Sequence, residues 1–227
     1  MEYRHEIKFL VSDSQLELLR YRIAPLMKQD LNQTGSYYMI RSLYFDDLQD
    51  NCLRENLDGD DRRNKYRIRV YNNDFGYIRL EKKSKIRAMT KKESVLISSA
   101  ECDAFMRERV IRIQEEFSDK KKCLFAEMQL KALRPKSIVE YERTAYIFRV
   151  GNVRITFDRN ICGSLESKDF LREKICSVPI LPSGIHILEV KFDELLPGFI
   201  YSALQIDALQ VAAFSKYSYS RMQGGSL

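Results

Sequence analysis

The stretch from Tyr66 to Lys85, YRIRVYNNDFGYIRLEKKSK, alternates apolar and charged residues on either side of a turn-rich link. Because successive side chains of a β-strand point to opposite faces, this period of two predicts a hairpin with one apolar and one ionic face. The link from Asn72 to Gly76 contains residues that tolerate unusual backbone angles, as a tight connection requires. Arg67 and Arg69 lie on the ionic face of the first strand. The rest of the fold must therefore cover the apolar face and account for the ionic one.

The same alternation returns far from the hairpin, in residues 6–9, 153–158 and 188–193. A half-exposed antiparallel sheet whose charged side meets water would explain one such hairpin. Repeated Arg and Lys with an occasional Glu, in place of Thr, Ser and Gln, favours one shared charged surface instead. If the sheet closes, the charged faces line a tunnel and the apolar faces lie outside. The sequence therefore predicts an α+β fold: a closed antiparallel β-barrel tunnel of about eight strands, with a charged interior and helices packed outside.

Hydrophobic periodicity predicts the remaining elements, with Ser12 or Asp13 as the cap of the first helix. Strands are expected at 2–11, 37–47, 91–98, 137–150, 153–161 and 187–193, and helices after residue 13 and at 47–56, 99–116, 117–136 and 200–214. No internal linker, fixed repeat or low-complexity tract divides the chain. Residues 1–227 are therefore expected to form a single domain.

Composition narrows the function classes. The formal net charge of +6 favours an acidic partner, and a cation-lined cavity suits a chain of phosphates because it is costly when empty. The five cysteines lack CxxC spacing, which indicates reduced thiols, and the pair His5 and His186 argues against a histidine-based zinc site. The N-terminus lacks the layout of a signal peptide, and no run reaches the length of a membrane span. The chain is expected in the cytoplasm.

Eight short motifs occur along nearly the whole chain in a fixed order: EIKF at 6–9, SLYFD at 42–46, RIR at 67–69, LEKK at 80–83, ERTAY at 142–146, RITFD at 154–158, LEVKF at 188–192 and SKY at 215–217. In this order they resemble the motifs of VTC domains. These are polyphosphate polymerase domains of the triphosphate tunnel metalloenzyme superfamily, which is related to CYTH proteins.

The resemblance implies an ATP-dependent phosphotransferase that adds the terminal phosphoryl group of ATP to a growing inorganic polyphosphate with the help of a divalent metal. Its expected partners are ATP, inorganic phosphate and polyphosphate, and no nucleic acid. Export of the product would need a separate membrane protein, through which the chain would associate with a membrane.

The matching positions imply the site residues. The catalytic set consists of Lys8, Arg67, Arg69, Lys83 and Glu189, and the further phosphate contacts are Arg54, Lys92, Arg143, Arg154, Lys191 and Lys216. Lys91 is the alternative to its neighbour Lys92. Glu189 with Glu6 is expected to hold the metal, with Glu81 or Asp158 as alternative helpers, and carboxylate ligands suit Mg²⁺ or Mn²⁺.

Two other functions remain open at this level. A triphosphate hydrolase would use the same tunnel with water as the acceptor. A non-catalytic polyanion or nucleic-acid binder would need exposed basic residues interleaved with aromatic ones. Here the aromatic residues alternate mostly onto the apolar faces and tryptophan is absent, which disfavours nucleic acid.

Overall fold

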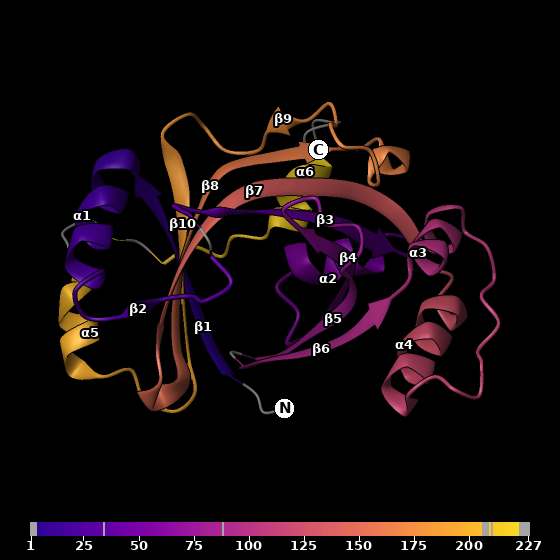
Figure 1. Cartoon of the computed structure of the whole chain (residues 1–227), viewed down its shortest axis with the longest axis horizontal. Helices are drawn as coiled ribbons and strands as arrows, with labels where there is room; N and C mark the ends of the chain where they lie inside the picture. The colour runs from indigo at the N-terminus through magenta and orange to yellow at the C-terminus, as the bar shows by residue number, and fades with distance from the viewer. Residues whose placement is uncertain (1–3, 34, 88, 206–208, 210, 223–227) are drawn as a thin grey trace.

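The fold is a strongly twisted antiparallel sheet with six helices, seen in a computed structural model that describes residues 4–33, 35–87, 89–205, 209 and 211–222 (Figure 1). The strands are β1 (Arg4–Ser12), β2 (Lys28–Gln29), β3 (Tyr38–Asp46), β4 (Arg62–Tyr71), β5 (Ile78–Ile86), β6 (Met89–Ile97), β7 (Arg134–Phe148), β8 (Val153–Ser164), β9 (Val178–Pro179) and β10 (Ile185–Phe192). The helices are α1 (Asp13–Ile23), α2 (Asn51–Leu57), α3 (Ser99–Met106), α4 (Asp119–Leu130), α5 (Gly198–Ala203) and α6 (Lys216–Met222).

Eight of the strands close into a barrel. Their order is β7-β3-β4-β5-β6-β1-β10-β8, and β7 pairs with β8 to complete the ring. All of these pairings are antiparallel, and the two-residue strands β2 and β9 extend the sheet beside β7 and β8. The closed antiparallel barrel expected from the alternating sequence is confirmed.

The apolar residues of the strands form two cores on the outside of the barrel. One core joins α1 and α5 to β1, β8 and β10, and it contains Leu19, Ile155 and Leu188, all fully buried. The other joins α3 and α4 to β3, β4 and β5, where Phe125 and Ile68 are fully buried. In Figure 1 these two helix pairs lie at opposite sides of the barrel. The outer faces of these strands are thus buried against helices, so the charged residues that alternate with the apolar ones must point inward.

Helix α6 is different because it packs against the inner side of the barrel wall. Tyr217 stacks on Tyr44 of β3 with ring centroids 5.2 Å apart, and the Ser220 hydroxyl lies 2.9 Å from that of Ser137 on β7. The Tyr217 hydroxyl donates to the carboxylate of Asp46 at 2.6 Å. That carboxylate also accepts two backbone N–H groups at the start of α2. One buried side chain therefore joins β3, α2 and α6.

The barrel has one weakly paired seam, between β1 and β6. Only Arg4 with Thr90 and His5 with Met89 are paired there, in the part of the chain that the structure describes. Beyond this point the chain before α6 takes the free edge of β1, since Val211 bridges to Phe9 and the backbone N–H of residue 212 donates to the Lys8 carbonyl at 2.8 Å.

The predicted helix boundaries needed correction. The helix expected at 99–116 ends at Met106, because Glu108 follows with a φ of 56°, in the left-handed region. The helix expected at 117–136 covers Asp119–Leu130, and Ala132 at φ 47° turns the chain into β7. Of the helix expected at 200–214, only α5 is observed, and positions 206–208 and 210 lie outside the described residues. No described helix has the length and apolar character needed to cross a membrane.

Candidate functional site

The interior of the barrel gathers most of the charged residues expected from the sequence. Strand β1 contributes Glu6 and Lys8, which lie opposite Lys191 and Glu189 of β10 in the register. The interior cations are Lys8, Lys65, Arg67, Arg69, Lys83, Lys92, Arg143, Lys191 and Lys216, and the interior carboxylates are Glu6, Glu81, Asp158 and Glu189. Cations clearly outnumber carboxylates. We divide all of these groups except Lys65 into two arginine clusters and one lysine cluster, according to the carboxylates they surround.

The first arginine cluster surrounds Glu81, whose side chain is fully buried. Arg67 contacts this carboxylate at 2.7 Å, Lys92 at 3.0 Å and Arg69 at 3.7 Å. Arg69 also donates to the hydroxyls of Ser42 and Tyr141, each at 3.1 Å. Burial opposes ionisation of Glu81, but the three cations outweigh it and hold the pKa of this carboxyl well below its usual range.

The second arginine cluster surrounds Asp158, which is also fully buried. Arg143 grips both carboxylate oxygens, with Nε at 2.6 Å and Nη2 at 2.7 Å, and Lys216 of α6 lies 2.6 Å away. Burial acts against the charge, yet Arg143 and Lys216 lower the pKa of Asp158. A fork-shaped guanidinium on a carboxylate is among the most rigid charged contacts in proteins, so this cluster fixes α6 in the barrel.

The lysine cluster comprises Glu6, Glu189, Lys8, Lys83 and Lys191. Lys83 contacts both oxygens of Glu6 at 2.6 Å, and Lys8 lies 3.3 Å from Glu6 and 3.8 Å from Glu189. Lys191 bridges the same two carboxylates. Burial and the neighbouring Glu189 oppose ionisation of Glu6, but the lysines prevail and lower its pKa. Burial in turn lowers the pKa of Lys83 to about 8, although Glu6 pulls it upward.

Two of the predicted phosphate contacts, Arg54 and Arg154, do not belong to the three clusters, and a third, Lys92, was predicted with Lys91 as its alternative. Arg54 is on α2 and its side chain is exposed. Arg154 is half-buried and contacts Asp30 at 2.6 Å and the Tyr38 hydroxyl at 3.0 Å. Of the two neighbouring lysines on β6, Lys92 points to Glu81 in the interior, while Lys91 contacts Glu93. The structure thus brings Lys92 into the cation set.

Sequence reasoning missed two interior groups. The Tyr44 hydroxyl accepts a hydrogen bond from Arg67 at 3.3 Å, and Arg67 and Arg69 lower its pKa against the effect of burial. Lys65 on β4 donates to the Ser215 hydroxyl at 2.8 Å. The signal for Lys65 was present, because it precedes Arg67 by two residues and so shares the same strand face.

The carboxylates of the lysine cluster fit a divalent metal. Glu6 and Glu189 are adjacent, hard oxygen donors, and Mg²⁺ in phosphate sites is typically held by one or two carboxylates together with substrate oxygens. Among the described residues no group of three or more His, Cys, Asp or Glu side chains surrounds one point. A metal here would therefore need phosphate oxygens and water to complete its coordination shell.

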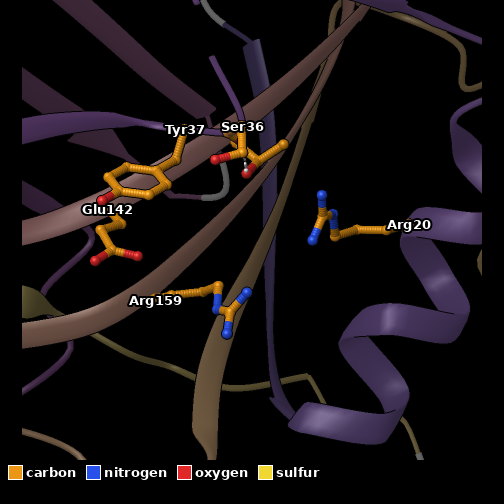
Figure 2. Close-up of a pocket in the computed structure, with 6 residues that line it drawn as sticks. Arg20, Ser36, Tyr37, Glu142 and Arg159 are labelled. Carbon is orange, nitrogen blue, oxygen red and sulfur yellow. Dashed lines mark hydrogen bonds between the residues drawn. The ribbon is translucent and has the colours of Figure 1, made fainter.

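Two hollows on the outer surface differ from the interior in charge. Figure 2 shows one of them, about 270 Å³ in volume, where Arg20 of α1 and Arg159 of β8 extend toward the same space. Glu142 lines this hollow, and Glu17 contacts Arg20 at 3.1 Å and Arg159 at 3.6 Å. The other, of about 470 Å³, is lined by Asp193 and Glu194 together with His5. Carboxylates balance the cations of the first hollow, and the described lining of the second has two carboxylates and no lysine or arginine, so neither matches the interior as a site for a polyanion.

The fold and the site together define a closed antiparallel barrel with a cation-rich interior. The sequence pattern of the VTC domain matches residues 3–223, and the chain therefore belongs to the VTC domain family. The family resemblance inferred from the eight motifs is confirmed.

A solved structure with a TM-score above 0.5 has a similar fold. A Bacillus halodurans protein described as a candidate adenylate cyclase is 15% identical, with a TM-score of 0.51, and the match covers 90% of this chain and 87% of that one. A Pyrococcus horikoshii protein is 14% identical with a TM-score of 0.49, over 94% and 96% of the two chains. A Mimivirus capping enzyme triphosphatase is 10% identical with a TM-score of 0.37, over 86% and 83%. No curated protein matches the sequence.

Proposed function

We propose that this chain transfers the terminal phosphoryl group of ATP to inorganic phosphate or a growing polyphosphate inside the barrel, with Mg²⁺ or Mn²⁺ bound at Glu189 and Glu6. The observation that carries the proposal is the excess of interior cations over interior carboxylates. Desolvated like charges repel, so the unliganded interior is unfavourable and a chain of phosphates relieves it. Membership of the VTC domain family supports the same function.

The chemistry asks the protein for positioning and charge neutralisation. Arg67 and Arg69 would hold successive phosphoryl groups from one strand, since guanidinium offers paired donors to phosphate oxygens. Lys8 and Lys83 would act as mobile point charges on the same chain. The metal, when bound, would neutralise charge on the phosphate oxygens. ATP and the acceptor would thus be held in line by one continuous cationic surface.

A hydrolase on the same barrel is less well supported. Water is a neutral acceptor and benefits from a group that removes its proton. The pKa values of Glu6, Glu81, Asp158 and Glu189 are all lowered by the cations around them, which makes these carboxylates poor proton acceptors. A phosphate acceptor is already an anion, and the interior cations can position it directly.

The decisive experiment is incubation of the purified chain with ATP and Mn²⁺, followed by a polyphosphate gel, phosphorus NMR and an assay for ADP. Formation of ADP together with a ladder of polyphosphate supports the proposal. Release of orthophosphate without a ladder identifies a hydrolase. If neither product forms while triphosphate still binds, the chain is a polyanion-binding module.

A further inference from the structure

Strand β4 carries a row of three cations on its inner face. Lys65, Arg67 and Arg69 alternate along the strand, so neighbouring members are about 6.6 Å apart in the strand direction. Arg67 and Arg69 lie beside Glu81, whereas Lys65 is opposite Lys83 in the β4–β5 register. The row therefore extends from the first arginine cluster to the lysine cluster.

Lys65 differs from the other members of this row because it has no carboxylate partner. Its amine donates to the Ser215 hydroxyl at 2.8 Å, and in the described part of the chain no carboxylate oxygen lies within 4.0 Å of it. The charged groups that act on it are Lys8 and Glu6 of β1, Lys83 of β5 and Arg63 of its own strand. Cations dominate this environment, with Glu6 as the opposing charge.

We propose that Lys65 and Ser215 form an additional phosphate-binding position at the end of the β4 row, and that the Lys65 amine takes up a proton when a phosphate group occupies it. The inference rests on the proposed polyphosphate function. It extends that function, because the family resemblance implies a phosphate contact at neither Lys65 nor Ser215. It predicts that the contribution of Lys65 to affinity depends on the length of the polyphosphate, and that the protein takes up a proton on binding.

The electrostatics supply the reason for the proton. Burial, followed by repulsion from Lys8, Lys83 and Arg63, lowers the pKa of Lys65 well below that of a free lysine. A phosphate group placed beside the amine reverses this balance, because an adjacent anion favours the charged form. The proton comes from solvent and no covalent bond changes.

The hydrogen-bonding partner is compatible with both states of the amine. The Ser215 oxygen also accepts the backbone N–H of Ser218 at 3.3 Å, which leaves the hydroxyl proton available. A neutral Lys65 amine can accept that proton in a hydrogen bond, and a charged one can donate to the oxygen. Ser215 can thus hold the amine in place before and after the phosphate arrives.

The test is isothermal titration calorimetry of the full chain with pyrophosphate, tripolyphosphate and tetrapolyphosphate, without metal, at several pH values between 7 and 10. Each titration is repeated in buffers of different ionisation enthalpy, which yields the number of protons taken up. We compare wild type with Lys65→Met, because subtraction removes the proton exchange of the ligands themselves. Wild type should take up more protons per tetrapolyphosphate than Lys65→Met. Lys65→Met should also bind tetrapolyphosphate about tenfold more weakly, the effect of one lost charge-assisted contact, and pyrophosphate almost as well as wild type.

Two variants serve as controls. Lys65→Arg keeps a permanent charge, so it should retain the affinity for tetrapolyphosphate but lose the additional proton uptake. Lys82→Met removes a lysine from the outer face of β5, where it contacts Glu127 at 2.7 Å, and should change neither quantity. Melting curves confirm that each variant is folded.

The outcomes separate this inference from the proposed function. If wild type binds no polyphosphate, both fail. If wild type binds but Lys65→Met has the same proton uptake, or loses affinity equally for all three chain lengths, the Lys65 position is wrong while the proposed function stands.

Discussion

The arginine clusters and the lysine cluster line the same barrel, yet they hold their carboxylates by different means. Asp158 is gripped at both oxygens by one guanidinium, and Glu81 is contacted by two. In the lysine cluster, three ammonium groups share Glu6 and Glu189 at distances up to 3.8 Å. A guanidinium fork fixes direction, whereas an ammonium is a point charge on a flexible stem. We interpret the arginine clusters as a fixed frame and the lysine cluster as the part that exchanges its partners for metal and phosphate.

Neutralising the carboxylate at the centre of the frame should give the largest effect. Glu81→Gln leaves Arg67, Arg69 and Lys92 without a buried counter-charge, which should cost about 3–5 kcal/mol of folding free energy. At about 2–4 °C per kcal/mol for a domain of this size, Tm should fall by roughly 6–20 °C. Thermal unfolding without ligand measures the loss.

The matched control for that experiment is Glu127→Gln. Glu127 pairs with Lys82 on the outer face of the same strand, and its side chain is 26% exposed. Partly exposed ion pairs contribute little, so a change of about 1 kcal/mol or less is expected. Equal losses in the two variants would mean that the inner carboxylate has no special structural role.

Neutralising a carboxylate of the lysine cluster should impair activity more than folding. Glu189→Gln removes the proposed metal ligand while the cations remain, so turnover with Mn²⁺ should fall by about 100-fold or more and binding of triphosphate should persist. Activity assays and metal-free calorimetry on the same preparation measure the two quantities. Turnover close to wild type would exclude the metal-binding role of Glu189.

Ligand stabilisation tests whether the frame also binds substrate. A ligand at a hundredfold excess over its Kd stabilises the folded state by about 2.7 kcal/mol, and tripolyphosphate should therefore raise Tm by roughly 5–11 °C. Arg69→Met should reduce this rise. It should cost little without ligand, because Arg69 is the more distant guanidinium at 3.7 Å from Glu81. A full rise in Arg69→Met would remove this residue from the phosphate contacts.

The smallest expected effect is that of Lys65, the member of the β4 row without a carboxylate partner, on stability in the absence of ligand. An unfolded lysine keeps its proton up to about pH 10.5, whereas Lys65 in the folded protein loses it at lower pH. The unfolded state therefore binds more protons between these values, and the stability of wild type rises with pH across that window. Lys65→Met lacks this repulsion. It should melt above wild type at pH 7, with a difference that shrinks toward pH 10.5. A lower Tm at pH 7 would identify Lys65 as a structural ion-pair partner.

The sequence was sufficient to predict the barrel and most of the interior. Strand parity places Arg67, Glu81 and Glu189 on one side of the sheet, and only closure brings such distant strands around one space. The eight motifs then supplied the roles of these residues. The domain assignment and the roles themselves stay predictions.

Other features depend on tertiary contacts that no local pattern reveals. Helix α6 is seven residues long and carries Ser and Tyr in place of strong helix formers, so Asp46 and Asp158 hold it rather than its own propensity. The charged segment after Met106 reads as a continuation of the helix, but the left-handed backbone at Glu108 ends it. Lys65 belongs to no motif, and its lack of a carboxylate partner is visible only in three dimensions.

The seam between β1 and β6 has a consequence for how the molecule opens. Elements exchange their amide hydrogens at rates set by the free energy of the smallest opening that exposes them. Strand β4 is paired along most of its length on both sides, whereas among the described residues two pairs join β6 to β1. Deuterium should therefore enter the seam-facing edge of β6 well before the centre of β4. Because residues 211 and 212 bond to the edge of β1 and lead directly into α6, release of that segment would expose the β1 edge beside Lys8 and Glu6. Among the described residues, two backbone pairs close the ring at this seam.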